Sequence, residues 1–277
     1  MKLSLVLSTQ AAKFEAVAFK GDFESNVAKI AGWGYDGVEL AIRDPKLVDG
    51  AELERVVSAH GLVVPAIGTG QAWGEEGLSF TDPDPAVRAA AIERTQSHIP
   101  FAARTGAIII IGLLRGIVKS GVDHAQAMDW LVEALQECCA AARSFGPAQD
   151  KPYGVRIALE PICRYETTLI NSAVQGLELI EQVGADNMGL LLDTFHMNIE
   201  EPVIEDSIRA CGDRIFHFHV ADSNRWYPGA GHLNFKSILD ALFATGYQGF
   251  VSGEFMPLPD ADSSAQRSIA YLRQLRG

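Results

Sequence analysis

Four residues that can bind a metal ion each end or follow a short apolar run in the second half of the chain. They are Glu160, Asp193, His219 and Glu254, at intervals of 33, 26 and 35 residues. If the four runs are successive parallel strands of a barrel, their carboxyl ends meet on one face. Carboxylates held together repel one another and resist ionising unless a cation lies among them. The spacing therefore predicts a site for one divalent metal ion.

The donor set narrows the choice of metal and of chemistry. Three carboxylates and one imidazole suit Mn²⁺, Mg²⁺ or Co²⁺, and they lack the thiolates that are typical of structural zinc. We expect Mn²⁺, with Mg²⁺ or Co²⁺ as alternatives. A metal beside two glutamates favours proton transfer next to a carbonyl group, because the metal stabilises the enediolate that forms when the carbon-bound proton leaves. If Glu160 and Glu254 lie on opposite faces of that carbon, its configuration inverts and the enzyme is an epimerase.

Strand and helix patterns alternate along the whole chain, as a parallel α/β fold requires. Helical patterns lie near 23–33, 50–60, 85–105, 123–146, 171–184, 202–211, 234–245 and 261–275. The eight predicted strands are Lys2–Leu7, Gly37–Leu40, Val63–Gly68, Ala107–Gly112, Val155–Glu160, Met188–Asp193, Ile215–Val220 and Phe250–Phe255. Eight such units favour a (β/α)8 TIM barrel over an open doubly wound sheet, with residues 1–277 as a single catalytic domain.

Composition excludes several other classes of protein. With 277 residues and 48% hydrophobic side chains, the chain can bury one large core. The formal net charge of -12 would repel a phosphate backbone, so we expect no nucleic-acid partner. No apolar run approaches the ~20 residues that span a bilayer, and Met1–Leu7 is too short for a secretory signal, so we expect no membrane association. Four cysteines without metal-type spacing indicate reduced thiols in a cytoplasmic protein.

Three long motifs resemble those of a known family. They are Glu160–Thr167, Leu192–Glu201, and His217–Arg225 together with Gly229–His232. On these motifs, residues 155–257 resemble the ketose 3-epimerase family within the xylose-isomerase-like barrels. The first half of the chain resembles the 5-keto-L-gluconate epimerase branch, which interconverts 5-keto-L-gluconate and D-tagaturonate. The segments that carry this second resemblance are Met1–Ser8, Ala18–Asp22, Ile42–Pro45, Ala66–Gln71 and Ile110–Gly116.

The resemblance implies a role for each matching residue. It implies a small-molecule substrate, a keto-sugar or keto-sugar acid, and a homo-oligomer, either a dimer or a tetramer. The implied roles are acid/base catalysis for Glu160 and Glu254, metal binding for those two with Asp193 and His219, carbonyl polarisation for His196 and Arg225, and a hydrogen bond to a substrate hydroxyl for Glu166.

A sugar acid would also bring a carboxylate group, and guanidinium is the side chain that binds carboxylates through two parallel hydrogen bonds. Arg115 follows the fourth predicted strand and Arg43 follows the second, on the same predicted face as the metal site. We therefore expect Arg115, or else Arg43, to bind the substrate carboxylate. His217 shares a strand face with His219 and is interpreted as an interior histidine or as a residue that supports the metal ligand.

Other functions remain open on sequence alone. The same metal and enediolate chemistry serves a sugar isomerase, a dehydratase or a decarboxylase, because the placement of the substrate decides which bond changes. A metal-dependent endonuclease on the same barrel would need more histidines and a basic rim. A sugar-binding barrel without activity would not need a pair of acid/base residues. We expect an epimerase that acts beside the keto group.

Overall fold

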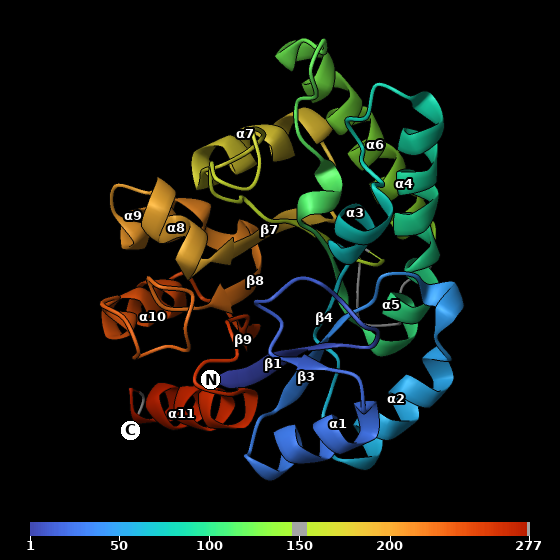
Figure 1. Ribbon diagram of the computed structural model, residues 1–277. Helices are drawn as coiled ribbons and strands as arrows, with labels where there is room; N and C mark the ends of the chain where they lie inside the picture. Colours follow the sequence, from blue (N-terminus) through green and yellow to red (C-terminus); the bar gives the residue numbers. More distant parts are fainter. Residues whose placement is uncertain (146–153, 276–277) are drawn as a thin grey trace.

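Eight parallel strands close into a barrel because the last strand pairs with the first. In this computed structural model, which describes residues 1–145 and 154–275, β1 (Lys2–Ser8) pairs with β9 (Phe250–Gly253). Between them follow, in chain order, β3 (Gly37–Ala41), β4 (Ala66–Gly68), β5 (Ile108–Ile111), β6 (Ile157–Leu159), β7 (Met188–Asp193) and β8 (Ile215–Val220). Helices surround the strands (Figure 1). The predicted (β/α)8 barrel is therefore confirmed.

Several strands differ from the prediction; β6, for example, covers only Ile157–Leu159 of the predicted Val155–Glu160. A short additional strand, β2 (Phe19–Lys20), pairs with the end of β1. The strand predicted over Val63–Gly68 begins only at Ala66, and Val63 forms an isolated bridge with Gly37. Pro65 lies between these two parts and has no amide hydrogen to donate to a ladder, which shortens the strand.

The helices follow the predicted order. Those that surround the barrel are α1 (Phe23–Gly32), α2 (Gly50–Ala59), α4 (Pro85–Ser97), α5 (Ile99–Thr105), α6 (His124–Ser144), α7 (Ala173–Val183), α9 (Ile204–Cys211), α10 (Phe235–Ala244) and α11 (Ala261–Gln274). Side chains satisfy the free amides at many helix starts; Ser172, for example, forms a capping box with Gln175 at α7. The predicted end of the helix over 123–146 falls outside the described residues. The chain that the structure describes has no helix long and apolar enough to cross a membrane.

Three helical features were not predicted. The pattern over 85–105 is two helices, α4 and α5, which meet at His98 just before Pro100. Pro100 cannot donate a backbone hydrogen bond, so a continuous helix would be interrupted there. Two short helices, α3 (Gln71–Glu76) and α8 (Thr194–Glu200), lie in the connections after β4 and β7. Both follow strand ends on the face where the site lies.

The barrel interior is apolar in its middle and polar at its carboxyl end. A small cluster inside the barrel consists of Ala66, Ile108, Ile110, Ala158 and Leu191. Because strand side chains alternate between faces, the residues two positions after Ala158 and Leu191 point the same way, and these are Glu160 and Asp193. The apolar layer thus forms the floor beneath the polar residues at the strand ends.

Candidate active site

The strand ends bring the four predicted metal ligands together. One possible ligand atom from each of Glu160, Asp193, His219 and Glu254 lies within 4.8 Å of the others. Asp193 is the last residue of β7, His219 lies in β8, and Glu160 and Glu254 directly follow β6 and β9. The barrel therefore converts four positions that are distant in sequence into one cluster.

Three atoms in this cluster are buried without a hydrogen-bond partner among the described residues. They are Oε1 of Glu160, Oδ2 of Asp193 and Nδ1 of His219. Burying polar atoms without partners is costly, and a cation among them would remove that cost. The orphaned atoms and the hard oxygen-rich donor set fit a divalent metal ion such as Mn²⁺ or Mg²⁺.

The electrostatics of the cluster also favour a cation. Burial and the neighbouring carboxylate of Glu254 raise the pKa of Glu160 to about 8. Burial likewise raises the pKa of Glu254. Burial alone would raise the pKa of Asp193 too, but Arg225, His196 and His219 together outweigh burial and hold that pKa below its ordinary value. Without a cation the cluster therefore retains a proton on one glutamate at neutral pH.

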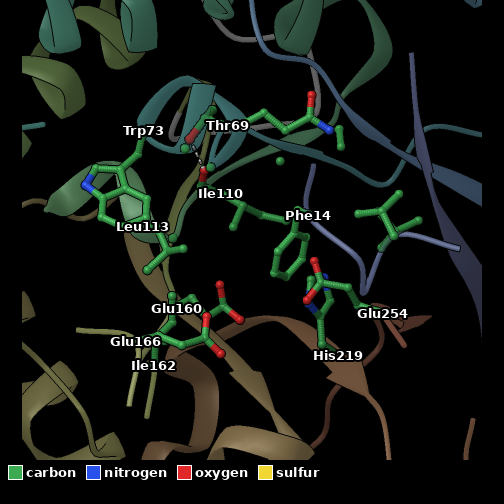
Figure 2. A pocket seen from close by; sticks show the side chains of 18 of the residues that line it. Phe14, Thr69, Trp73, Ile110, Leu113, Glu160, Ile162, Glu166, His219 and Glu254 are labelled. Atoms are coloured by element: carbon green, nitrogen blue, oxygen red, sulfur yellow. Dashed lines mark hydrogen bonds and ion pairs between the residues drawn. The ribbon is translucent and has the colours of Figure 1, made fainter. Parts of the chain in front are cut away.

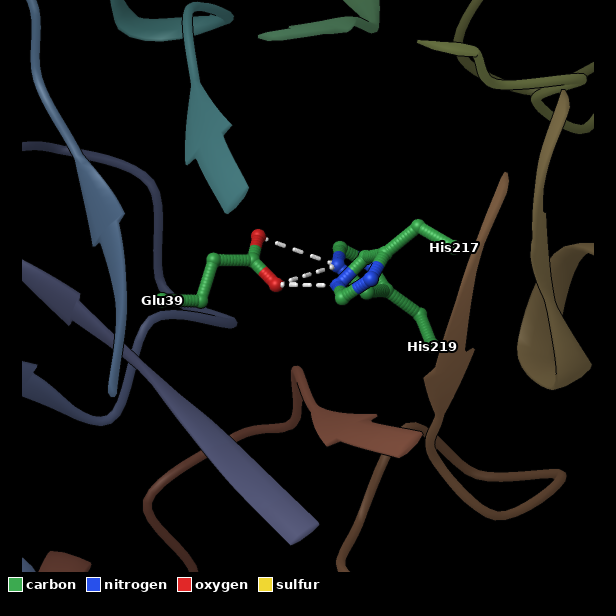
Figure 3. Close-up of side chains that lie close together, drawn as sticks. All are labelled: Glu39, His217 and His219. Carbon is green, nitrogen blue, oxygen red and sulfur yellow. Dashed lines mark hydrogen bonds and ion pairs between the residues drawn. The ribbon is translucent and has the colours of Figure 1, made fainter. Parts of the chain in front are cut away.

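Glu39 is a buried residue of the site that sequence reasoning missed. It lies on β3, is only 1% exposed, and accepts hydrogen bonds from Nε2 of both His217 (2.7 Å) and His219 (3.0 Å) (Figure 3). Burial would raise its pKa, but the two histidines outweigh burial and hold the pKa far below its ordinary value. A carboxylate within a predicted buried strand was the signal available in the sequence, since such a group requires a partner.

A cavity of about 280 Å³ opens beside the cluster. Figure 2 shows Glu160 and Glu166 on one side of it and His219 and Glu254 on the other. Its volume is at the lower end of the range typical of small-molecule sites, about 300–1,000 Å³. The apolar part of its wall includes Val6, Phe14, Val17, Ala41, Trp73, Ile110, Leu113 and Ile162. Such a wall excludes water from a small polar substrate bound at the cluster.

His196 and Arg225 lie beside the two glutamates. Nη2 of Arg225 donates to Glu254 (2.7 Å), and its Nη1 lies 3.1 Å from Nε2 of His196. Burial and the charge of Arg225 lower the pKa of His196 to about 3, so the ring is neutral. The amide of Cys163 donates to Nδ1 of the ring (3.4 Å), and Nη1 of Arg225, which can only donate, points at Nε2. Arg225 and His196 therefore lie side by side in the wall of the cavity, next to the two glutamates.

The backbone of Arg225 is held in a strained conformation. Its φ of 62° lies in the left-handed region, which non-glycine residues seldom adopt and which recurs at functional sites. The carboxylate of Asp222 organises this loop by accepting from the amides of Ser223 (2.8 Å), Gly229 (2.9 Å) and Leu233 (3.1 Å). The Arg225 amide also donates to the carbonyl of Asp222 (2.8 Å). This loop therefore fixes where the guanidinium can reach.

Glu166 borders the cavity, whereas the two arginines expected at a substrate carboxylate do not. Oε1 of Glu166 lies 4.0 Å from Nη1 of Arg225. Arg115 is fully buried and donates to the carbonyl oxygens of Gly112 (3.1 Å), Ile170 (3.1 Å) and Glu160. The 3₁₀ turn over Leu113–Arg115 directs the side chain to these carbonyls and away from the cavity. Its position does not support the expected contact with substrate.

Arg43 is also engaged elsewhere. Its Nε lies 3.3 Å from Oε1 of Glu76, and it does not line the cavity. The cationic residues that do line it, within the described chain, are Arg225 and Lys13. Lys13 belongs to the loop after β1 and was not singled out from the sequence, because nothing local shows that this loop folds over the barrel.

Comparison with known proteins gives a consistent picture. The family model described as xylose isomerase-like TIM barrel matches residues 27–275. An L-ribulose 3-epimerase from Mesorhizobium japonicum is 31% identical over 262 residues, which cover 95% of this chain and 85% of that protein. A D-psicose 3-epimerase from Enterocloster bolteae is 39% identical over 249 residues, covering 82% of this chain and 75% of that protein.

Solved structures of such enzymes have the same fold. The D-allulose 3-epimerase from Methylomonas sp. in complex with D-allulose superimposes with a TM-score of 0.81 at 25% identity, covering 99% of this chain and 96% of that chain. An L-ribulose 3-epimerase structure gives a TM-score of 0.83 at 27% identity, covering 99% and 94%. The similarity thus extends over the whole barrel and includes the strand ends that carry the cluster.

Proposed function

This chain belongs to the xylose isomerase-like TIM barrel family and, within it, to the ketose 3-epimerases, and on that premise we propose which substrate it takes and how. The protein is an isomerase of the epimerase class that acts on carbohydrates. We assign it the inversion of the carbon next to the keto group of a keto-sugar acid, of the 5-keto-L-gluconate and D-tagaturonate type, or of a ketose. The reaction passes through a cis-enediolate, with two glutamates as acid and base.

Glu160, Asp193, His219 and Glu254 would hold one divalent metal ion, Mn²⁺ in preference to Mg²⁺ or Co²⁺. The support is the convergence of four donors with three orphaned buried atoms. When bound, such an ion supplies electrostatic stabilisation for negative charge that develops on substrate oxygens. Manganese is preferred because the set combines carboxylate oxygens with one imidazole nitrogen.

The single observation that carries the epimerase mechanism is the placement of Glu160 and Glu254 on opposite sides of the cavity (Figure 2). One glutamate removes the carbon-bound proton from one face, and the other returns a proton to the opposite face. His196 and Arg225, which lie side by side in the cavity wall, would polarise the substrate carbonyl and stabilise the oxygen on which negative charge develops. Glu166 accepts a hydrogen bond from a substrate hydroxyl.

Proton NMR in D₂O tests this function directly. The Mg²⁺-loaded enzyme is offered D-tagaturonate and, in a separate sample, D-fructose. We expect deuterium at the carbon beside the ketone, together with signals of a new epimer. A bound metal without exchange on either substrate would contradict the proposal. A product that has lost water or carbon dioxide would instead identify a dehydratase or decarboxylase that uses the same residues.

Variants of the two glutamates test the two-base scheme. Glu160→Gln and Glu254→Gln should each abolish net epimerisation, while either variant can still exchange the substrate proton on the face that its remaining glutamate serves. Glu178→Gln, an exposed position on α7, is the matched control and should remain fully active. Full turnover by either active-site variant, with metal content confirmed in the same samples, would refute the scheme.

We assign the substrate carboxylate to Lys13 rather than to Arg115. Lys13 lines the cavity, and its ammonium group lies 3.0 Å from Glu75 at the mouth. Nζ of Lys20 donates to the carbonyls of Ala12 (3.0 Å) and Phe14 (2.5 Å) and so holds this loop over the site. Arg225, the other cationic residue of the wall, is held by Glu254 in a buried pair, whereas the ammonium group of Lys13 is exposed and its pair with Glu75 is correspondingly weak. The ammonium group of Lys13 is therefore the cation that is free to bind the carboxylate of a keto-acid.

The substrate preference of a Lys13→Met variant tests this assignment. The side chain of Lys13 is 82% exposed, and exposed ion pairs contribute up to about 1 kcal/mol. We therefore expect kcat/KM for D-tagaturonate to fall by up to about fivefold and kcat/KM for D-fructose to remain unchanged. Lys46→Met, which removes an exposed lysine paired with Glu93, should change neither value. An equal loss on both substrates would exclude a carboxylate contact.

We also propose a cytoplasmic homo-oligomer, either a dimer or a tetramer. All four cysteines are free and buried, as is usual for proteins of reducing compartments. Tyr165, at 79% exposed, and Val174, at 55% exposed, are large apolar side chains that association would cover. Light scattering on the purified protein measures the mass, and Tyr165→Asp should shift an oligomer towards monomer. A monomeric wild type would contradict this part of the proposal.

A further inference from the structure

Glu39 connects two strands on opposite sides of the barrel. Its carboxylate, from β3, accepts Nε2–H of both His217 and His219, from β8 (Figure 3). All three side chains are at most 2% exposed. The two imidazole rings are edge to face, with centroids 5.3 Å apart, so they reach the same carboxylate from different directions. This cluster lies inside the barrel, directly below the proposed metal site.

The contact determines which nitrogen of His219 is available. Both oxygens of Glu39 lie 3.0 Å from Nε2 of His219. A carboxylate accepts hydrogen bonds and cannot donate them when ionised, so Nε2 must carry a proton. The other nitrogen, Nδ1, lies 3.8 Å from Asp193 Oδ2 and 3.7 Å from Glu254 Oε2 and has no hydrogen-bond partner among the described residues. Nδ1 therefore faces the other three donors.

We propose that Glu39 is a positioning residue for the metal site: it holds the His219 ring with its proton on Nε2, so that Nδ1 presents its lone pair to the cation. A carboxylate behind a histidine ligand fixes the ring orientation and makes the ligand nitrogen more basic. Glu39 itself is held by His217, which is the role of that second histidine. This inference rests on the metal site proposed above.

An amide in place of the carboxylate would disturb this arrangement. The Gln side chain is neutral and has one acceptor oxygen and one NH₂ group, whereas both terminal oxygens of Glu39 lie 3.0 Å from Nε2 of His219, so an NH₂ group would face that nitrogen. If its NH₂ group faces His219, Nε2 must become the acceptor and the ring proton moves to Nδ1. A proton on Nδ1 blocks the atom that would bind the metal. Glu39→Gln should therefore weaken metal binding with little change in the volume of the side chain.

Titration of the metal-free enzyme with Mn²⁺, followed by the electron paramagnetic resonance signal of free Mn²⁺, measures the affinity. We expect Glu39→Gln to raise the Kd by about 10- to 100-fold, as is typical for residues that support a metal ligand. Glu39→Asp retains the charge but reaches less far, so its Kd should lie between those of Glu39→Gln and the wild type. Equal Kd values for Glu39→Gln and wild type would overturn the inference.

Asn187→Ala separates this effect from general destabilisation. Asn187 is fully buried and donates to the carbonyls of Cys139 and Val155 (both 3.0 Å), at the opposite end of β7 from Asp193. This variant should lower Tm yet retain the wild-type Kd for Mn²⁺. Equal losses of Mn²⁺ affinity in Asn187→Ala and Glu39→Gln would show that Glu39 only stabilises the fold and does not position His219. A wild type that binds no Mn²⁺ would instead refute the metal site itself.

A measurement on the wild type keeps the inference testable if Glu39→Gln does not fold. In the Mg²⁺-loaded enzyme, nitrogen-correlated proton NMR should show protons on Nε2 of both His217 and His219, shifted downfield and slow to exchange with water. Rapid exchange of the His219 proton, or its presence on Nδ1, would show that Glu39 does not hold this ring.

Discussion

Glu254 accepts a 2.7 Å hydrogen bond from Arg225, whereas Oε1 of Glu160, the other glutamate of the cluster, has no hydrogen-bond partner among the described residues. The two proposed acid/base residues are thus unequal before any ligand binds. The charge of Arg225 favours the ionised form of Glu254, while burial and Glu254 itself raise the pKa of Glu160 to about 8. The hydrogen bond from Arg225 therefore favours Glu160 over Glu254 as the site of the proton that the cluster retains at neutral pH.

Metal binding should therefore release protons. At pH 7 the metal-free cluster holds one proton on Glu160 and a second ring proton on His219. Burial lowers the pKa of His219, but the charge and hydrogen bond of Glu39 raise it overall to about 10. A cation requires both ligands deprotonated, so about two protons should leave, and Mn²⁺ affinity should weaken as pH falls below about 10 and more steeply below about 8. Calorimetry in two buffers of different ionisation enthalpy counts the protons. Binding without proton release would contradict the prediction.

The absence of a side chain at Gly112 leaves room for the carboxylate of Glu160. A Cβ atom at this position would lie 2.9 Å from Oε2 of Glu160. Gly112→Ala should displace that carboxylate and lower kcat about tenfold, which corresponds to about 1.4 kcal/mol in the barrier. Gly32→Ala is the control, because a Cβ there meets no atom within 4 Å. Steady-state kinetics on both variants checks the prediction, and an unchanged kcat in Gly112→Ala would show that Glu160 tolerates the added methyl group.

Arg115 should act on stability rather than on substrate preference. Arg115→Met removes the donor from the buried carbonyls of Gly112, Ile170 and Glu160. Unsatisfied buried acceptors are costly, and we expect the free energy of unfolding to fall by on the order of 3 kcal/mol in guanidinium titrations. The exposed Arg55, paired with Glu52, provides a control, Arg55→Met, with a change below about 0.5 kcal/mol. A selective loss of activity on keto-acids in Arg115→Met would restore its expected role at the substrate.

His98 should make the fold sensitive to acid. Its ring is fully buried, both nitrogens lack partners among the described residues, and burial with the charge of Arg94 lowers its pKa to about 3. The unfolded chain binds this proton near pH 6.5, so stability should be lost as pH falls from 6.5 towards 3, by up to about 1.4 kcal/mol per pH unit. His98→Leu should remove that contribution in urea titrations at pH 7 and 5. His124→Gln, at the exposed start of α6, is the control, and an unchanged pH dependence in His98→Leu would contradict the assignment.

The sequence by itself determined the barrel and the grouping of the four candidate metal ligands. Strand and helix patterns are local, and the closure of a parallel barrel brings every strand end to one face whatever the loops do. Glu160, Asp193, His219 and Glu254 could therefore be grouped from their positions at strand ends alone. His196, Arg225 and Glu166 followed from motifs in the same connections.

Only the tertiary structure decided which residues meet across the barrel and in the loops. Glu39 reaches His219 over 180 residues of sequence, because the register of eight strands sets which inward side chains face each other. Arg115 turns to backbone carbonyls and Lys13 lines the cavity, because the conformation of each loop depends on what it packs against. Strand ends follow from local pattern, whereas contacts between distant side chains depend on the closed barrel as a whole.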